Sequence, residues 1–216
     1  INGHTGSISS LVINKDYELI SGSSDKTIKI WNMVTGQEKR TLTGHTSSVN
    51  SLVLNKDNQL VSGSDDGAIK IWNMETGQVK RTLNGHKSSV NSLKISDNNE
   101  LISGSYDNTI KIWNMETGQV KRTLKGDTIY VNSLVINKDN ELISGSYDNT
   151  IKIWNMTTGQ EKRTLTGHTS HINSLVINKY NELISGSSDN KIKIWNMESG
   201  QVIRTLNGHT SGVYSL

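Results

Sequence analysis

Residues 44–84 read GHTSSVNSLVLNKDNQLVSGSDDGAIKIWNMETGQVKRTLN, and this stretch decides the fold. It contains four short apolar or alternating segments, at residues 49–54, 59–64, 68–72 and 78–83. The separators NKD, DDG and METG are rich in Asn, Asp and Gly, which tolerate turn dihedral angles. No segment has apolar residues at helical spacing over a length sufficient for an α-helix. The stretch therefore predicts a four-stranded antiparallel meander.

The same pattern is repeated along the chain with a period of 41 residues, the distance from Gly3 to Gly44. One such unit cannot bury its apolar surface alone and must pack against its copies. A tryptophan recurs in step in every copy, at Trp31, Trp72, Trp113, Trp154 and Trp195. We therefore expect a single domain over residues 1–216, composed of repeats 3–43, 44–84, 85–125, 126–166 and 167–207 and a partial repeat 208–216.

The third segment of each repeat indicates how the copies pack. Side chains alternate along a strand, so Ile69 and Ile71 face one side of the sheet while Lys70 and Trp72 face the other. Apolar groups on both sides require both faces to be covered, which sheets stacked radially around an axis achieve. The expected fold class is all-β: a β-propeller of four-stranded antiparallel blades, with five 41-residue repeats plus one extra strand.

Composition narrows the class of protein. The 216 residues include 23 basic and 20 acidic residues, interspersed in every repeat, for a formal net charge of +3. This pattern is typical of a solvated surface, so we expect no nucleic-acid partner. No apolar run reaches the length of a membrane span, and the N-terminus lacks the charged and apolar segments of a signal peptide. There is no cysteine and hence no disulfide. We expect a soluble, cytoplasmic protein with no membrane partner.

Three short motifs carry a family resemblance. Gly-His at residues 3–4, Ser-x-Asp at 23–25 and Trp-Asn at 31–32 recur in this order and in register over the copies. In these motifs the whole chain resembles the WD-repeat β-propeller family. It departs from the family pattern in two ways. Every copy has Asn where the family's Trp-Asp dipeptide has Asp, and the fourth copy has Gly126-Asp127 in place of Gly-His.

The resemblance implies a buried hydrogen-bond chain in each repeat, running from Trp through a strand Ser and a His to an Asp. The donors and acceptors agree with this order, because Trp only donates, Ser and neutral imidazole do both, and carboxylate only accepts. A buried member left unpaired costs about 1 to 3 kcal/mol. The positions are His4, Ser21, Asp25, Trp31, His45, Ser62, Asp66, Trp72, His86, Ser103, Asp107, Trp113, Asp148, Trp154, His168, Ser185, Asp189 and Trp195.

Asp, His and Ser also occur together in nucleophilic triads. A catalytic set would have to occur five times over in this chain, so we expect no catalytic residues and no enzyme activity. The motif His residues belong to different sheets, too far apart to share one ion, so we expect no metal. The SGS segments lie within strands and lack the strand, loop and helix order of a phosphate loop, and we expect no cofactor.

The positions at which the copies differ are candidates for partner binding. In the family, the rim at one end of the ring binds partners. The resemblance, together with neighbouring positions, maps this rim onto Tyr106, Tyr130, Tyr147, His171, Ile129 and Asp65. Tyr is enriched at binding hot spots because it combines rigid apolar area with a polar tip. Drift among recently copied repeats explains the same differences without a partner.

Three functions from different classes stay open. The first is a non-catalytic protein–protein interaction scaffold that presents a peptide- or protein-binding rim. The second is a recently amplified or designed repeat assembly with no specialised partner, since residues 99–115 and 140–156 are identical. The third is a small-molecule or glycan-binding propeller, which needs the same polar and aromatic set in every copy. The rim residues vary between copies, which argues against this third function.

The number of repeats bears on assembly. Propellers span roughly four to eight blades, and those of the WD-repeat family usually have about seven. Five repeats and one extra strand therefore predict an incomplete ring. We expect it to be completed by further repeats or by another chain in a homo-oligomer, because near-identical copies offer interchangeable packing faces.

Overall fold

The computed structural model describes residues 3–126 and 129–216. The second repeat forms strands β5 (Val49–Leu54), β6 (Leu60–Ser64), β7 (Ile69–Trp72) and β8 (Val79–Leu83). All four end where the sequence pattern predicts, and three begin one residue later. The described residues form five four-stranded sheets, which confirms the all-β class and the meander of each repeat.

The remaining strands complete the other four sheets. They are β1 (Ile8–Ile13), β2 (Glu18–Ser23), β3 (Ile28–Asn32), β4 (Glu38–Leu42), β9 (Val90–Ile95), β10 (Leu101–Ser105), β11 (Thr109–Trp113), β12 (Val120–Lys125), β13 (Val131–Ile136), β14 (Glu141–Ser146), β15 (Ile151–Asn155), β16 (Glu161–Leu165), β17 (Ile172–Ile177), β18 (Leu183–Ser187), β19 (Ile192–Trp195) and β20 (Val202–Leu206).

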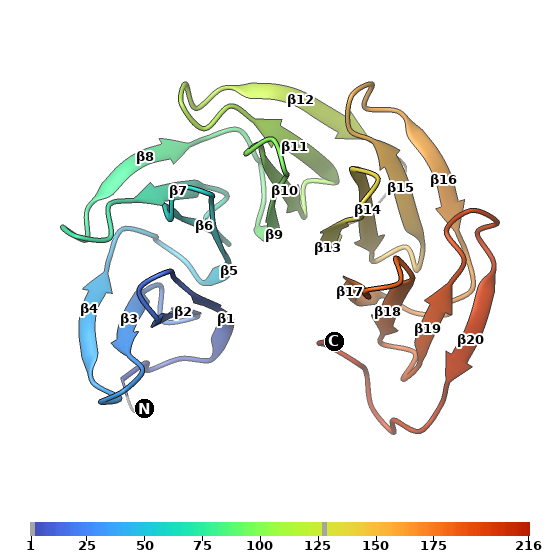
Figure 1. The fold of residues 1–216 in the computed structure, drawn as a ribbon, viewed down its shortest axis with the longest axis horizontal. Helices are drawn as coiled ribbons and strands as arrows, with labels where there is room; N and C mark the ends of the chain where they lie inside the picture. Colours follow the sequence, from blue (N-terminus) through green and yellow to red (C-terminus); the bar gives the residue numbers. More distant parts are fainter. Residues whose placement is uncertain (1–2, 127–128) are drawn as a thin grey trace. The chain divides into compact units, whose positions relative to one another are not determined.

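Strands within each sheet follow sequence order, so every connection inside a sheet is a short hairpin turn. Figure 1 shows this for β1 to β4 in blue and for β17 to β20 in red. The register sets Ile20 opposite Ile30 and Val61 opposite Ile71 on neighbouring strands. Directly opposed residues share one face of a sheet. Each sheet therefore presents a continuous apolar face.

The chain divides into two compact units. Unit 1 comprises Ile1–Ser103 and Trp113–Lys121, and unit 2 comprises Gly104–Ile112 and Arg122–Leu216. The third sheet contributes residues to both units. The single domain over residues 1–216 stays a prediction.

Both faces of the second sheet are covered, as the alternation along its third strand predicts. Trp72 packs in one core cluster with Ile20 and Ile28 of the first sheet. Ile69 and Ile71 pack in another cluster with residues of β9 and β10. The fourth and fifth sheets pack in the same way within unit 2, through a cluster that includes Trp195. Trp72 and Trp195 thus each cover the sheet that precedes their own in the sequence.

The second strand of each sheet contains a glycine at a position where the neighbouring segment leaves no room for a Cβ atom. A Cβ atom on Gly63 would lie 2.7 Å from Cγ1 of Val90, and one on Gly22 would lie 2.8 Å from Cγ1 of Val49. Such distances leave no room for a side chain. Packing against the next sheet therefore explains the glycine of the SGS segment in the first four sheets, and Gly186 of the fifth packs in the same way against Val213.

The partial repeat differs from its prediction. Residues 208–216 form no strand in the structure, so the expected extra strand is wrong in this respect. They nevertheless dock on the fifth sheet, where Val213 N–H donates to the Ser187 carbonyl at 3.0 Å. Leu216 N–H donates to Ser174 Oγ at 3.2 Å, as Leu52 N–H does to Ser10 Oγ in unit 1. Regular strand structure needs a paired neighbour, and this segment gains only isolated bonds.

Candidate functional site

The buried hydrogen-bond chain is seen most fully in the second sheet. Trp72 Nε1–H donates to Ser62 Oγ at 2.8 Å, and Ser62 Oγ lies 2.7 Å from Nε2 of His45. His45 Nδ1 lies 2.8 Å from Asp66 Oδ2 and is the donor, because the carboxylate can only accept. Thr46 N–H also donates to that oxygen, at 2.9 Å. The order of donors runs from Trp to Asp.

The other repeats reproduce this chain to different extents. The structure brings the same four groups together in the sets His4, Ser21, Asp25, Trp31 and His168, Ser185, Asp189, Trp195. In unit 1, Ser103 bonds both His86 and Trp113, at 2.6 and 2.8 Å. In unit 2, Asp107 and Asp148 accept from Thr109 and Thr150, and Trp154 donates to Ser144 at 2.8 Å. Asp127 lies outside the described residues.

The geometry of the set argues against a nucleophilic role for its serine. Ser62 is completely buried, and its Oγ already accepts the indole N–H of Trp72. A substrate carbonyl could not approach this oxygen. The chain of bonds instead ties two turns and two strands of one sheet together. Residues 3–126 and 129–216 also hold no group of three or more His, Cys, Asp or Glu side chains that could bind a metal.

Burial sets the charge state of these histidines. The pKa of His45 lies below 6.5 because burial disfavours the imidazolium, and the Asp66 carboxylate only partly offsets this. The pKa of His168 is lowered for the same reason. Burial by itself raises the pKa of Asp66, but hydrogen bonds from Thr46, Ala68 and His45 outweigh it and hold that pKa below 3.8. A neutral imidazole therefore faces a carboxylate at neutral pH.

We expect the protein to lose stability as the pH falls below about 6.5. His45 and His168 have lower pKa values in the folded protein than in the unfolded chain, so the unfolded chain binds protons first. Asp66 adds to this loss below about pH 3.8, because its folded pKa is also lowered. Denaturant midpoints measured between about pH 7.5 and 5 check the prediction.

The matched control for this pH dependence is the double variant His45→Gln with His168→Gln. Its baseline stability is lower, but its midpoint should change less between about pH 7 and 5, since glutamine does not titrate. A wild-type midpoint that stays constant or rises on acidification would contradict the prediction.

The Asn that replaces Asp in the Trp-Asp dipeptide organises the turn between the third and fourth strands. Asn73 Oδ1 accepts from the N–H groups of Glu75 and Thr76, at 2.9 and 3.0 Å. Gly77, with φ of +77°, completes the turn in the left-handed region. The amide oxygen does what an aspartate oxygen does in an Asx turn. Replacing the family's Asp by Asn therefore preserves this turn.

The three predicted tyrosines and the histidine form one aromatic cluster in unit 2. The ring centroids of Tyr106 and Tyr130 are 4.7 Å apart, and those of Tyr130 and Tyr147 are 5.5 Å apart, edge to face. The His171 ring stacks on Tyr147 with centroids 4.1 Å apart and planes inclined by 23°. Spacings of about 4.5 to 7 Å are typical of favourable aromatic pairs. We call Tyr106, Tyr130, Tyr147 and His171 the aromatic cluster.

Hydrogen bonds to and from the backbone fix the segments that carry the aromatic cluster. Tyr130 has φ of +49°, unusual for a non-glycine residue, and its N–H donates to Asn108 Oδ1 at 2.9 Å. Tyr147 N–H donates to the Ile129 carbonyl at 3.1 Å, and His171 Nδ1–H donates to the Tyr147 carbonyl at 2.7 Å. Tyr130 remains 41% exposed and Ile129 51% exposed. The cluster is both held in place and open to solvent.

Asp65 belongs to a different unit from the aromatic cluster. It lies in unit 1, exposed, and accepts a hydrogen bond from Asn50 Nδ2 at 2.7 Å. Its role in partner binding stays a prediction.

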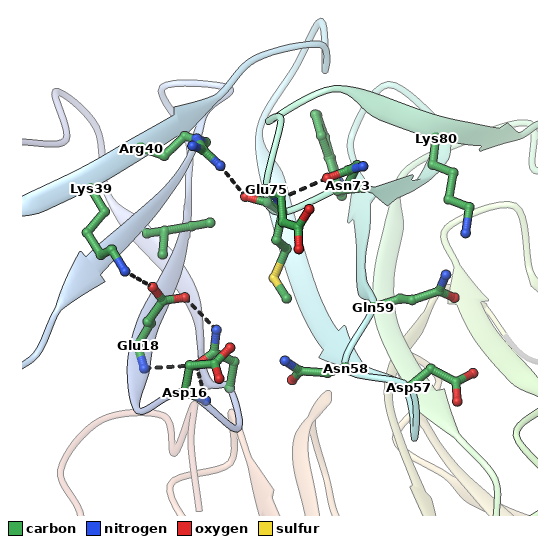
Figure 2. A pocket seen from close by; sticks show the side chains of 14 residues that line it. Asp16, Glu18, Lys39, Arg40, Asp57, Asn58, Gln59, Asn73, Glu75 and Lys80 are labelled. Atoms are coloured by element: carbon green, nitrogen blue, oxygen red, sulfur yellow. Dashed lines mark hydrogen bonds and ion pairs between the residues drawn. The ribbon is translucent and has the colours of Figure 1, made fainter.

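Sequence reasoning missed two pockets, one in each unit. They lie among the turns that join first to second and third to fourth strands, and measure about 790 and 770 Å³. Figure 2 shows the first, in unit 1, with the ion pair between Lys39 and Glu18 on one wall. Arg40 Nη1–H donates to the Met74 carbonyl of the next sheet. The recurring Lys-Arg pair of the fourth strand is the available signal, but as a pattern it indicates only protection of an outer strand.

Comparison with known families agrees with this architecture. The family described as WD domain, G-beta repeat matches residues 1–32, 36–73, 77–114, 118–155 and 159–196. The chain belongs to this WD-repeat family. The segment 36–73 covers β4 to β7, so a family repeat joins the outer strand of one sheet to three strands of the next. No curated protein matches the chain.

Membership of the family gives the general class of function. WD-repeat domains are generally non-catalytic scaffolds for protein interactions. The part of the chain that the structure describes contains no helix of the length and hydropathy needed to cross a membrane.

Proposed function

We propose that this protein is a non-catalytic scaffold that binds a peptide or protein through the aromatic cluster of unit 2. The observation that carries the proposal is the convergence of Tyr106, Tyr130, Tyr147 and His171 on one another, from three different repeats, beside the exposed Ile129. Corresponding positions in the other repeats hold mostly small or charged residues. Partner binding at this one place accounts for the difference.

Preorganisation supports the proposal. Rings that already pack on one another lose little rotamer freedom when a partner covers them, so more of the contact energy appears as affinity. Tyr130 is anchored through its own backbone N–H as well as through its ring. Tyrosines of this kind are frequent hot spots because they offer apolar area and a hydroxyl together.

A peptide display library tests the proposal even though the partner is unidentified. Random peptides selected on the wild-type protein are expected to bind the aromatic cluster. Truncating Tyr130 to Ala should then remove about 2 kcal/mol of binding free energy, or roughly thirtyfold in affinity. Tyr147→Ala should weaken binding similarly. Isothermal titration calorimetry on the selected peptides measures both.

The control variant carries Ser7→Ala with Ser24→Ala in the first repeat, both at exposed positions of unit 1. It should bind the selected peptides as tightly as wild type. Tyrosine variants with unchanged affinity, or a library that yields no binders, would remove the aromatic cluster as a binding site. Thermal unfolding of each variant verifies that the fold is retained.

We also propose that β1 packs against a second copy of the chain. Ile8 and Leu11 of β1 are 55% and 56% exposed, whereas their equivalents in β5, Val49 and Leu52, are 0% and 5% exposed. The buried equivalents pack against the sheet that precedes them in the sequence. An exposed apolar strand face favours association with another apolar protein surface.

Self-association is expected to depend on Leu11. Leu11→Glu places a charge on the exposed face of β1 and should shift the protein toward monomer, since burying an unpaired carboxylate is costly. Sedimentation equilibrium over a range of concentrations measures this. The control is Tyr17→Glu, at another exposed residue of the first repeat. A wild-type protein that is monomeric at all concentrations would argue against the second copy.

A further inference from the structure

The pocket of unit 2 between the fourth and fifth sheets is a variant of the pocket in Figure 2. Glu141 and Lys162 occupy in it the places of Glu18 and Lys39, and the two volumes are nearly equal, about 770 and 790 Å³. Three positions of one wall differ. Where the first pocket has Asp57, Gln59 and Lys80, the pocket of unit 2 has Tyr180, Glu182 and Ile203.

Two of these substitutions make the wall more apolar, since Tyr180 replaces Asp57 and Ile203 replaces Lys80, while Glu182 puts a carboxylate in the place of Gln59. Figure 2 shows the polar version, with Asp57, Gln59 and Lys80 on the same side of the pocket. In unit 2, Tyr180 is 70% exposed and Ile203 is 52% exposed, and both line the pocket. Two large apolar side chains therefore face a solvent-filled hollow.

The same substitutions leave one carboxylate without its usual cation. A lysine of the fourth strand pairs with a glutamate at or just before the start of the second strand in three sheets, as Lys39 with Glu18, Lys121 with Glu100 and Lys162 with Glu141. In the fifth sheet Ile203 takes the place of that lysine, so Glu182 forms no such ion pair within the described residues. One oxygen of Glu182 accepts from Asn178 Nδ2 at 2.7 Å, which leaves its other oxygen for a ligand.

Two cations that line this pocket are already bound to other groups. Lys162 is paired with Glu141, and Arg163 donates to the Met197 carbonyl at 2.6 Å. The Lys179 ammonium lies 4.9 Å from the centroid of the Tyr180 ring, within the range of a cation–π contact.

The geometry points to a binding site for a peptide segment that carries an arginine or lysine next to an apolar residue. The cationic head replaces the missing lysine ammonium at Glu182. The aliphatic stem and the neighbouring apolar residue cover Ile203 and Tyr180. Long basic side chains suit this arrangement because their stems are apolar and their heads are charged. This site is separate from the aromatic cluster and does not depend on its function.

The test uses the acetylated and amidated pentapeptide Gly-Leu-Arg-Leu-Gly, titrated into the full chain and followed by calorimetry and by Tyr and Trp resonances. Its neutral control contains citrulline in place of arginine. We expect the arginine peptide to bind at least about tenfold more tightly than the citrulline peptide, because only it forms a charge-assisted bond. Tyr130→Ala should leave this binding unchanged.

The decisive variant is Ile203→Lys, which rebuilds the lysine–glutamate pair of the other sheets. It should fold normally and no longer bind the arginine peptide. The converse variant, with Asp57→Tyr, Gln59→Glu and Lys80→Ile, should gain a second site in unit 1. Equal binding of the citrulline peptide, equal binding by Ile203→Lys, or no binding of the arginine peptide to wild type would each overturn the inference.

Discussion

Replacing Ser62 by alanine is expected to lower the free energy of unfolding by about 3 kcal/mol. The hydroxyl of this one residue serves both Trp72 Nε1–H and His45 Nε2, at 2.8 and 2.7 Å. Alanine leaves both groups without a partner in a site that water does not reach, and each buried unpaired group costs about 1 to 3 kcal/mol. The loss is large because one side chain joins two members of the hydrogen-bond chain.

Chemical denaturation followed by tryptophan fluorescence measures this loss. Ser9→Ala is the matched control, because it removes the same hydroxyl from an exposed position of β1. Its free energy of unfolding should stay within about 0.5 kcal/mol of wild type. If Ser62→Ala loses no more than Ser9→Ala, the chain of bonds does not stabilise the fold.

Gly145→Ala is expected to cost about 2 to 3 kcal/mol, although the change adds only one methyl group. Its Cβ would lie 2.5 Å from Cγ2 and 3.0 Å from Cβ of Ile172, which is completely buried. The contact can be relieved only by moving the fourth and fifth sheets apart or by forcing Ile172 out of its rotamer. Either response disturbs the core cluster that contains Trp195.

A double-mutant cycle separates this steric effect from loss of glycine flexibility. Ile172→Ala removes the opposing atoms and is destabilising alone, because it empties part of the core. Combined with Gly145→Ala, it should cost less than the sum of the two single changes by at least about 1 kcal/mol. Additive losses would exclude the close approach as the cause.

The fold could be predicted because its determinants are local and recur. Asn, Asp and Gly mark each turn, and the alternation of Ile69, Lys70, Ile71 and Trp72 gives both faces of a strand. The strand ends follow directly from these signals. The absence of a strand at residues 208–216 could not be predicted in the same way, since a strand depends on its neighbour as well as on its own sequence.

The sites were harder to predict, for a physical reason. Tyr130 stands out because it differs from its counterparts, yet neither its positive φ nor its packing on Tyr106 is visible in the sequence. The bond from Arg40 to the Met74 carbonyl involves a backbone acceptor from another repeat, which any residue type would supply. A contact to a backbone carbonyl does not constrain the residue type at the acceptor position, so a sequence pattern cannot reveal it.

The close contact between neighbouring sheets also bears on how such a gene changes. Gly22 against Val49 and Gly63 against Val90 are the same contact formed by successive repeats. When unequal recombination removes or inserts the codons of one whole repeat, the flanking sheets meet through that contact again. Alleles of different length can therefore all encode folded products. Residues 99–115 and 140–156 are identical, so two successive repeats already share the whole second and third strands and the turn between them.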